Sequence, residues 1–128
     1  MMYGRNYYRG IRKVLLGLNW MLPGDNHALR ASSYNAHLEV VKYLHQSFGL
    51  TTEDARADNG SALRWSSRNG HLEVVKYLHQ SFGLTTEDVR ADNNFALHWS
   101  SYHGDLKVIK YLHQSFGLTT EDAHACNS

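Results

Sequence analysis

The sequence predicts an all-α fold, a solenoid in which paired antiparallel helices stack on one another. A block of thirteen residues, KYLHQSFGLTTED, occurs unchanged three times, at 42–54, 76–88 and 110–122, with a spacing of 34 residues. A fixed period of this length is typical of repeat proteins, whose units bury a continuous core only against their neighbours. Within each unit, apolar residues recur at helical spacing. We therefore expect three full repeats after a degenerate N-terminal cap.

The second helix of each repeat is the clearer of the two. In 71–83, apolar side chains recur every three or four residues and form one stripe, made of Leu72, Val75, Leu78 and Phe82. Gly83 then provides a helix stop in the left-handed conformation. The same pattern predicts helices at 37–49 and 105–117.

The first helix is shorter and more polar, and is expected at 28–35, 62–69 and 96–103. The small side chains of Ser66 and Ser67 allow it to lie close to the longer helix. Gly70 turns the chain between the two helices of its repeat, and Ala36 stands at the same place in the first repeat. An alanine is a poor turn residue if the backbone needs a positive φ, so we expect strain or a changed turn at Ala36.

The segment between repeats predicts a short helical turn followed by a loop. Thr85 with Asp88 three residues later fits a capping box, in which each side chain hydrogen-bonds the other residue's backbone N–H. Asn93 and Asn94 follow, and asparagine tolerates the left-handed conformation better than most residues. We expect both to adopt it before the next first helix.

The segment NGSALRWSSRNGHLEVVKYLHQ resembles an ankyrin repeat, and the resemblance covers about 25–126. The residues that match are Leu63, Gly70, His71, Leu72, Glu73, Val74, Val75, Lys76 and Leu78. The chain departs from the common pattern by lacking the Thr-Pro pair, by a period of 34 residues where 33 is usual, and by lacking the usual hairpin sequence, which leaves open whether the projecting β-finger of the family forms. This long variant is similar to arrays in giant DNA viruses and protists.

The repeat spacing divides the chain into four parts. A degenerate cap or partial repeat is expected at 1–24, and ankyrin-like repeats at 25–58, 59–92 and 93–128, the third with a truncated C-terminal end.

Composition excludes several classes of function. The formal net charge of +1 gives no strong basic footprint for nucleic acid, although the basic and aromatic arm at 1–13 leaves such contact as an alternative. Cys126 is the only cysteine, so the fold needs no oxidising compartment. No stretch approaches the roughly 20 apolar residues that span a bilayer. The basic residues before 14–22 resemble a signal peptide, but no cleavage site follows, so we expect an intracellular protein and disfavour secretion.

The residues that suggest chemistry have simpler explanations. His45, His79 and His113 repeat at the period of the stack, so equivalent copies lie about 8–10 Å apart, too far to share a metal ion. The Glu-Asp pairs of each block fit helix starts rather than acid–base catalysis. Trp65 and Trp99 are expected mainly to pack between repeats. We therefore predict no catalytic residue, no cofactor and no metal.

Differences between the repeats concentrate in the loop and first helix. The segments 37–58 and 71–92 differ only at Ala55 against Val89, whereas 25–36 and 59–70 differ at half of their positions. In ankyrin-like stacks, the resemblance implies, the corresponding strip forms a concave face that meets partners, here 25–36, 59–70 and 93–104. The candidate partner-binding residues are His27, Tyr34, Asn35, Arg68, Asn69, Phe95, Tyr102 and His103. The alternative is that the repeats are recent copies and this strip merely tolerates change.

The sequence thus predicts a non-enzymatic protein–protein interaction module whose partner it does not identify. Two alternatives stay open: a fragment or decayed member of a multigene array with no partner of its own, and a small-molecule or nucleic-acid binder that uses the N-terminal arm. Stacked repeats bury apolar surface only against their neighbours, and no repeat is expected after the third. Leu97, Val108 and Leu112 of the third repeat are therefore expected to be partly bare. We expect the chain to be marginally stable or to self-associate through its C-terminal end.

Overall fold

The computed structural model describes residues 26–125, so the predictions for the cap at 1–24 and for the arm at 1–13 lie outside the described residues. Residues 26–125 contain no strand, and the predicted all-α fold is confirmed. The helices are α2 His27–Tyr34, α3 Leu38–Phe48, α4 Thr52–Ala55, α5 Ala57–Arg68, α6 Leu72–Gln80, α7 Thr86–His103, α8 Leu106–Gln114 and α9 Thr120–Ala125.

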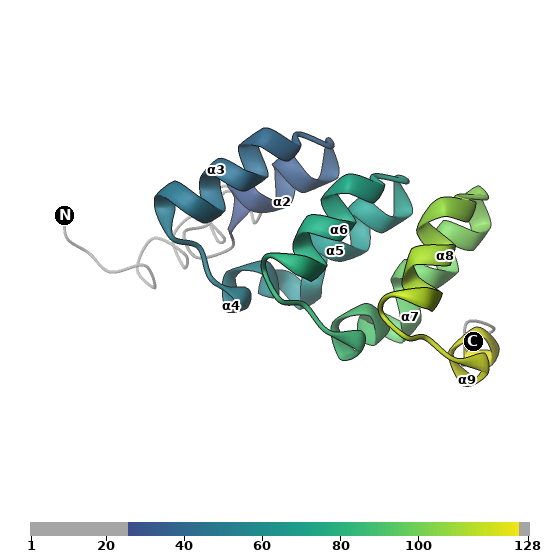
Figure 1. The fold of residues 1–128 in the computed structure, drawn as a ribbon. Helices are drawn as coiled ribbons and strands as arrows, with labels where there is room; N and C mark the ends of the chain where they lie inside the picture. The colour runs from purple at the N-terminus through teal and green to yellow at the C-terminus, as the bar shows by residue number, and fades with distance from the viewer. Residues whose placement is uncertain (1–25, 126–128) are drawn as a thin grey trace, which may run out of the picture.

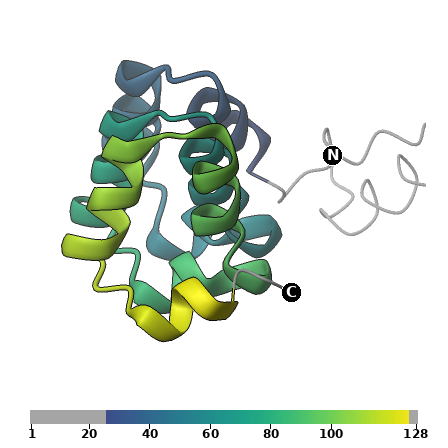
Figure 2. The ribbon, with the colours of Figure 1, turned by 90° about the vertical axis from the view of Figure 1, so that its right-hand side faces the viewer.

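Three helix pairs stand side by side in a row, α2 with α3, α5 with α6, and α7 with α8 (Figure 1). Seen along the row, the first helices form one layer and the second helices another, with the short helical turns at one edge (Figure 2). Neighbouring repeats contact each other more extensively through their first helices than through their second helices. The surface lined by the first helices is therefore continuous across the repeats.

The short turn and loop between repeats form as the sequence predicts. The N–H of Thr85 donates to Asp88 Oδ2 at 2.7 Å, which confirms the capping interaction, and Thr51 and Asp54 form the same box. In α7, Asn93 and Asn94 take φ angles of 58° and 59°, in the left-handed region. These residues break the long helical segment, so that the first helix of the third repeat begins in effect at Phe95.

The turn inside each repeat has the same conformation in all three copies. Gly70 and Gly104 have φ angles of 74° and 75°, and Ala36 has a φ of 63°. Because an L-residue is strained in this region, the expected strain at Ala36 is present.

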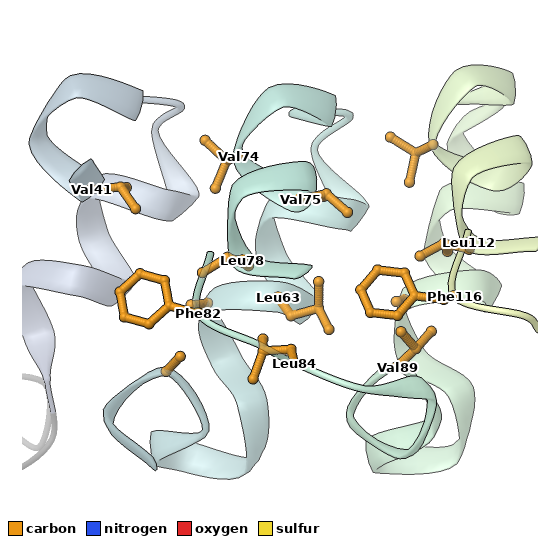
Figure 3. Packing of buried hydrophobic residues seen from close by; sticks show 14 of the residues in the cluster. Val41, Leu63, Val74, Val75, Leu78, Phe82, Leu84, Val89, Leu112 and Phe116 are labelled. Carbon is orange, nitrogen blue, oxygen red and sulfur yellow. The ribbon is translucent and has the colours of Figure 1, made fainter. Parts of the chain in front are cut away.

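Neighbouring repeats pack through two adjacent valines that point in opposite directions along the row. Figure 3 shows Val74 directed from α6 toward α3 and Val75 directed toward α8, and both are buried. Leu78 and Phe82 of the predicted stripe are also buried, whereas Leu72 is only half-buried. The stripe missed Val74 because a pattern read within one repeat ignores the neighbour on its other side.

The prediction that Val108 and Leu112 would be partly bare is wrong, since both are fully buried. Comparison of the three copies explains the error. Val108 corresponds to Val74, and this column faces the preceding repeat, which is present. Leu97, on the side away from the preceding repeat, is only half-buried, as expected.

The second helices of the last two repeats end earlier than predicted. α6 ends at Gln80 and α8 at Gln114, two residues before the phenylalanine of each block. The N–H of Phe82 donates to Tyr77 O, five residues back, at 3.2 Å, which widens the last turn. That widening lets the Phe82 ring enter the gap between α3 and α6 (Figure 3).

Ion pairs tie each short turn to the next one along the row. Arg56 Nε donates to Asp88 Oδ1 at 2.8 Å, and Arg90 Nε donates to Asp122 Oδ1 at 2.8 Å. The hydrogen bonds from Arg90, and then those from Thr119, lower the pKa of Asp122 to about 2 in spite of its burial. Burial raises the pKa of Asp88, but the hydrogen bonds from Arg56 and Thr85 outweigh it and lower that pKa overall.

Candidate functional site

The candidate surface is a strip of side chains on the first helices, which we call the first-helix strip. α2 supplies His27 and Tyr34, and Asn35 follows at its C-cap. The end of α5 supplies Arg68, with Asn69 at its C-cap, and the later part of α7 supplies the others. The strip comprises the eight sequence-predicted residues His27, Tyr34, Asn35, Arg68, Asn69, Phe95, Tyr102 and His103, together with Trp65 and Trp99, which ring contacts join to them.

Aromatic rings form a continuous row along this strip. The ring of Tyr34 lies 5.7 Å from that of Trp65, which lies 5.2 Å from Phe95. Phe95 lies 6.1 Å from Trp99, whose ring is 5.2 Å from Tyr102. The row therefore crosses all three repeats, and its two ends are exposed: Tyr34 is 44% accessible and Tyr102 74%.

Arg68 lies between the two tryptophans. Its guanidinium carbon is 5.1 Å from the Trp65 ring centroid and 5.4 Å from that of Trp99, within the range of cation–π attraction. Arg68 Nη1 also donates to Asn69 Oδ1 at 3.2 Å. The sequence interpretation assigned both tryptophans mainly to packing. Their position one helical turn before Arg68 and Tyr102 is the signal in the sequence that could have placed them in the strip.

Hydrogen bonds from side chains of the second repeat to a backbone carbonyl of the first fix the two repeats together at this surface. The carbonyl of Tyr34 accepts hydrogen bonds from Asn69 Nδ2 at 3.3 Å and from His71 Nε2 at 2.8 Å. The strip is therefore held in register across the first joint by residues of the turn that follows α5.

A shallow hollow of about 270 Å³ lies between α2 and α5 on the strip. Its walls are formed by His27, Arg30, Ala31, Tyr34, Asn35, Ser61 and Trp65. Three of the predicted residues thus line one cavity, and its size suits a side chain or short segment of a partner rather than a whole cofactor.

Charged side chains beside the strip are mostly paired with one another. Arg30 lies 3.4 Å from Asp58, and Arg64 lies 3.2 Å from Asp92. Arg64 also donates to the carbonyls of Asn59 and Asp58, so it supports the left-handed turn. Among residues 26–125, Arg68 forms no ion pair, so its charge is balanced only by the tryptophan faces and an amide.

The repeating histidines lie on the second helices, away from this strip. His45 Nδ1 and Tyr77 Oη are 2.7 Å apart, as are His79 Nδ1 and Tyr111 Oη. Burial lowers the pKa of His79. Within residues 26–125 no three His, Cys, Asp or Glu side chains gather closely enough to hold a metal ion. The same part of the chain has no helix of the length and apolar character that crossing a membrane requires.

Comparison with known proteins identifies one family. A family model of ankyrin repeats matches residues 13–122 with three copies of the repeat. No curated protein and no solved structure matches the chain.

Proposed function

Because the chain belongs to the ankyrin-repeat family, whose repeats generally serve as protein–protein interaction modules, we propose that it binds a protein partner through the first-helix strip. Repeats of this family are typically non-enzymatic, and we propose no catalytic role. The observation that carries the proposal is the row of aromatic rings that crosses all three repeats with both of its ends exposed. Tyr, Trp and Arg are the residue types that contribute most binding energy in protein interfaces.

The charges of the strip favour a partner segment that carries a carboxylate beside apolar side chains. Asp58 and Asp92 already neutralise Arg30 and Arg64, whereas Arg68 has no carboxylate among the described residues. A partner carboxylate that reached Arg68 would form a charge-assisted hydrogen bond next to two indole rings. Apolar side chains of the same segment would cover the rings and enter the hollow between α2 and α5.

The test is selection of binders from a displayed library of random linear peptides on the wild-type chain. Affinity for each selected peptide is then measured by calorimetry on two triple variants. One changes Tyr34, Arg68 and Tyr102 to alanine, and the other changes Lys42, Lys76 and Lys110, one residue from each second helix, to alanine. We expect the first variant to lose binding and the second to keep it, with acidic residues enriched among the selected peptides.

If the lysine variant lost binding and the strip variant kept it, the binding surface would lie on the second helices. Peptides that bind both variants equally well would contradict the proposal. A pull-down from the native host with the same two variants extends the test to the natural partner. If the wild-type chain captures no protein beyond those retained by the resin alone, the prediction of a decayed array member with no partner is favoured. Retention on heparin that disappears when 1–13 is deleted would favour the nucleic-acid alternative.

A further inference from the structure

The outward face of α3 exposes apolar side chains whose copies in the next two repeats are buried or half-buried. Phe48 is 69% accessible and Tyr43 61%, whereas Phe82 is 2% and Phe116 4% accessible. Val40 is likewise 47% exposed, although its copies in the other repeats are buried. The block 42–54 is identical in sequence to 76–88 and 110–122. The difference in exposure therefore comes from the neighbour that each block meets.

The blocks 76–88 and 110–122 each insert a phenylalanine, Phe82 or Phe116, into a hollow on the preceding repeat, which we call the socket. The ring of Phe82 lies 4.2 Å from that of His45, and its carbonyl accepts a hydrogen bond from Thr52 Oγ1 at 2.6 Å. Tyr77 Oη lies 2.7 Å from His45 Nδ1 beside it. Phe116 repeats the arrangement, with its ring 4.1 Å from His79. Figure 3 shows both phenylalanine rings in the gaps between repeats.

The far side of the third repeat carries the same socket without a phenylalanine in it. A hollow of about 270 Å³ is lined there by Leu97, Ile109, His113, Leu118, Thr119, Thr120 and Ala123. The residues at the same repeat positions on the side of the first repeat that receives Phe82 are Leu29, Val41, His45, Leu50, Thr51, Thr52 and Ala55. The two sets differ only by Ile109 in place of Val41.

We propose that the outward face of α3 in one chain binds the far side of the third repeat in a second copy. Phe48 of the block 42–54, which we call the Phe48 block, then fills the socket of that third repeat. A chain cannot fill its own socket, because α3 and α9 lie at opposite ends of the row (Figure 1). The joint continues an interface that already occurs twice within the chain, with the same inserted residues. Such a contact joins unlike faces, so it does not close on itself and produces stacks of increasing length.

The joint between molecules is weaker than the joints within the chain. His124 stands at the position that Arg56 and Arg90 occupy in the earlier repeats. The intermolecular joint therefore lacks the arginine–aspartate pair, 2.8 Å in both internal copies. The association is consequently reversible and increases with concentration.

Sedimentation velocity on the full chain over a wide range of concentrations tests the proposal. The wild type should form larger species as concentration rises. F48D, which removes the inserted ring, and A123R, which blocks the socket, should each stay monomeric. Ser47→Asp and Ser115→Arg are matched controls, because this serine is exposed in all three repeats, and both should associate like the wild type. Circular dichroism establishes that every variant is folded.

The mixture of the two blocked variants gives the decisive result. A123R retains its Phe48 block and F48D retains its socket, so an equimolar mixture should form a dimer and nothing larger. A monomeric wild type at all concentrations would overturn the proposal and favour cover of Phe48 within the same chain. Association that survives F48D, or blocked variants that fail to pair, would overturn it as well. The triple alanine variant of the first-helix strip should still stack, so this test and the binding test fail independently.

Discussion

The blocks 42–54 and 76–88 have the same sequence but different structures. In the first, α3 continues through Phe48 and ends on Gly49, whose φ is 70°. In the second, α6 ends at Gln80, and Phe82 leaves the helix to lie against His45. The preceding repeat is what the second block has and the first lacks among the described residues. Helix length and burial in this protein are thus set by the neighbouring repeat as well as by local sequence.

The comparison also bears on where the stability of the stack originates. In repeat proteins, stability is approximately the sum of the intrinsic stabilities of the repeats and the interactions between nearest neighbours. Identical side chains in different repeats should therefore differ in their contributions whenever their neighbours differ. The following predictions test this difference, beginning with the largest effect.

Truncation of the phenylalanine should be costly in the second repeat and nearly neutral in the first. Phe82→Ala removes a ring that is 2% accessible, and we expect the free energy of unfolding to fall by about 3–5 kcal/mol. Phe48→Ala removes a ring that is 69% accessible, and we expect a change within about 0.5 kcal/mol. Urea denaturation at low protein concentration measures both. Equal losses for the two variants would show that Phe48 is covered in solution.

In the turn inside each repeat, replacing alanine by glycine at Ala36 should raise stability, and replacing glycine by alanine at Gly70 should lower it. Ala36 has a φ of 63°, so Ala36→Gly relieves strain, and we expect a gain of up to about 1 kcal/mol. Gly70 has a φ of 74°, and a Cβ there would lie 3.0 Å from Asp105 Oδ1. Gly70→Ala should therefore cost about 1–2 kcal/mol. Thermal unfolding of both variants checks the signs, and a stabilising Gly70→Ala would contradict this account of the turn.

The smallest effect is expected from the ion pairs between short turns, because the Arg90 side chain is 34% accessible and water screens it. The pKa of Asp122 is lowered from 3.8 to about 2 in the folded chain. Its contribution to stability is therefore present above about pH 4 and is lost as the pH falls toward 2. In Arg90→Gln, the free energy of unfolding should fall less between about pH 4 and pH 2 than it does in the wild type. Urea midpoints measured from pH 5 downward compare the variant with the wild type, and identical profiles would rule out a role for this pair.

Features that depend on a few consecutive residues were predictable from the sequence. The repeat period, the capping box of Thr85 and Asp88, the left-handed Asn93 and Asn94 and the strained turn at Ala36 each depend on local chemistry. Features that depend on two repeats together were not. The burial of Val108 and Leu112, the early end of α6 and the insertion of Phe82 beside His45 all require knowledge of which face meets the neighbour.

The candidate site shows the same division. Comparison of the repeats selected Tyr34, Arg68 and Tyr102 as one variable column, and the structure places all three on one surface. The insertion of Arg68 between Trp65 and Trp99 was not predictable, because it depends on the distance between successive first helices. The same distance decides that the rings of successive repeats touch and form a row.

The most direct test of the central claim, that Phe48 is an uncovered copy of a ring buried in the other repeats, is ¹⁹F NMR of the full chain with all four phenylalanines fluorinated. Phe48→Leu and Phe82→Leu identify the two resonances to be compared. In dilute solution, a soluble paramagnetic agent should broaden the Phe48 resonance strongly and leave that of Phe82 sharp. Equal protection of Phe48 and Phe82 in dilute solution would contradict the account.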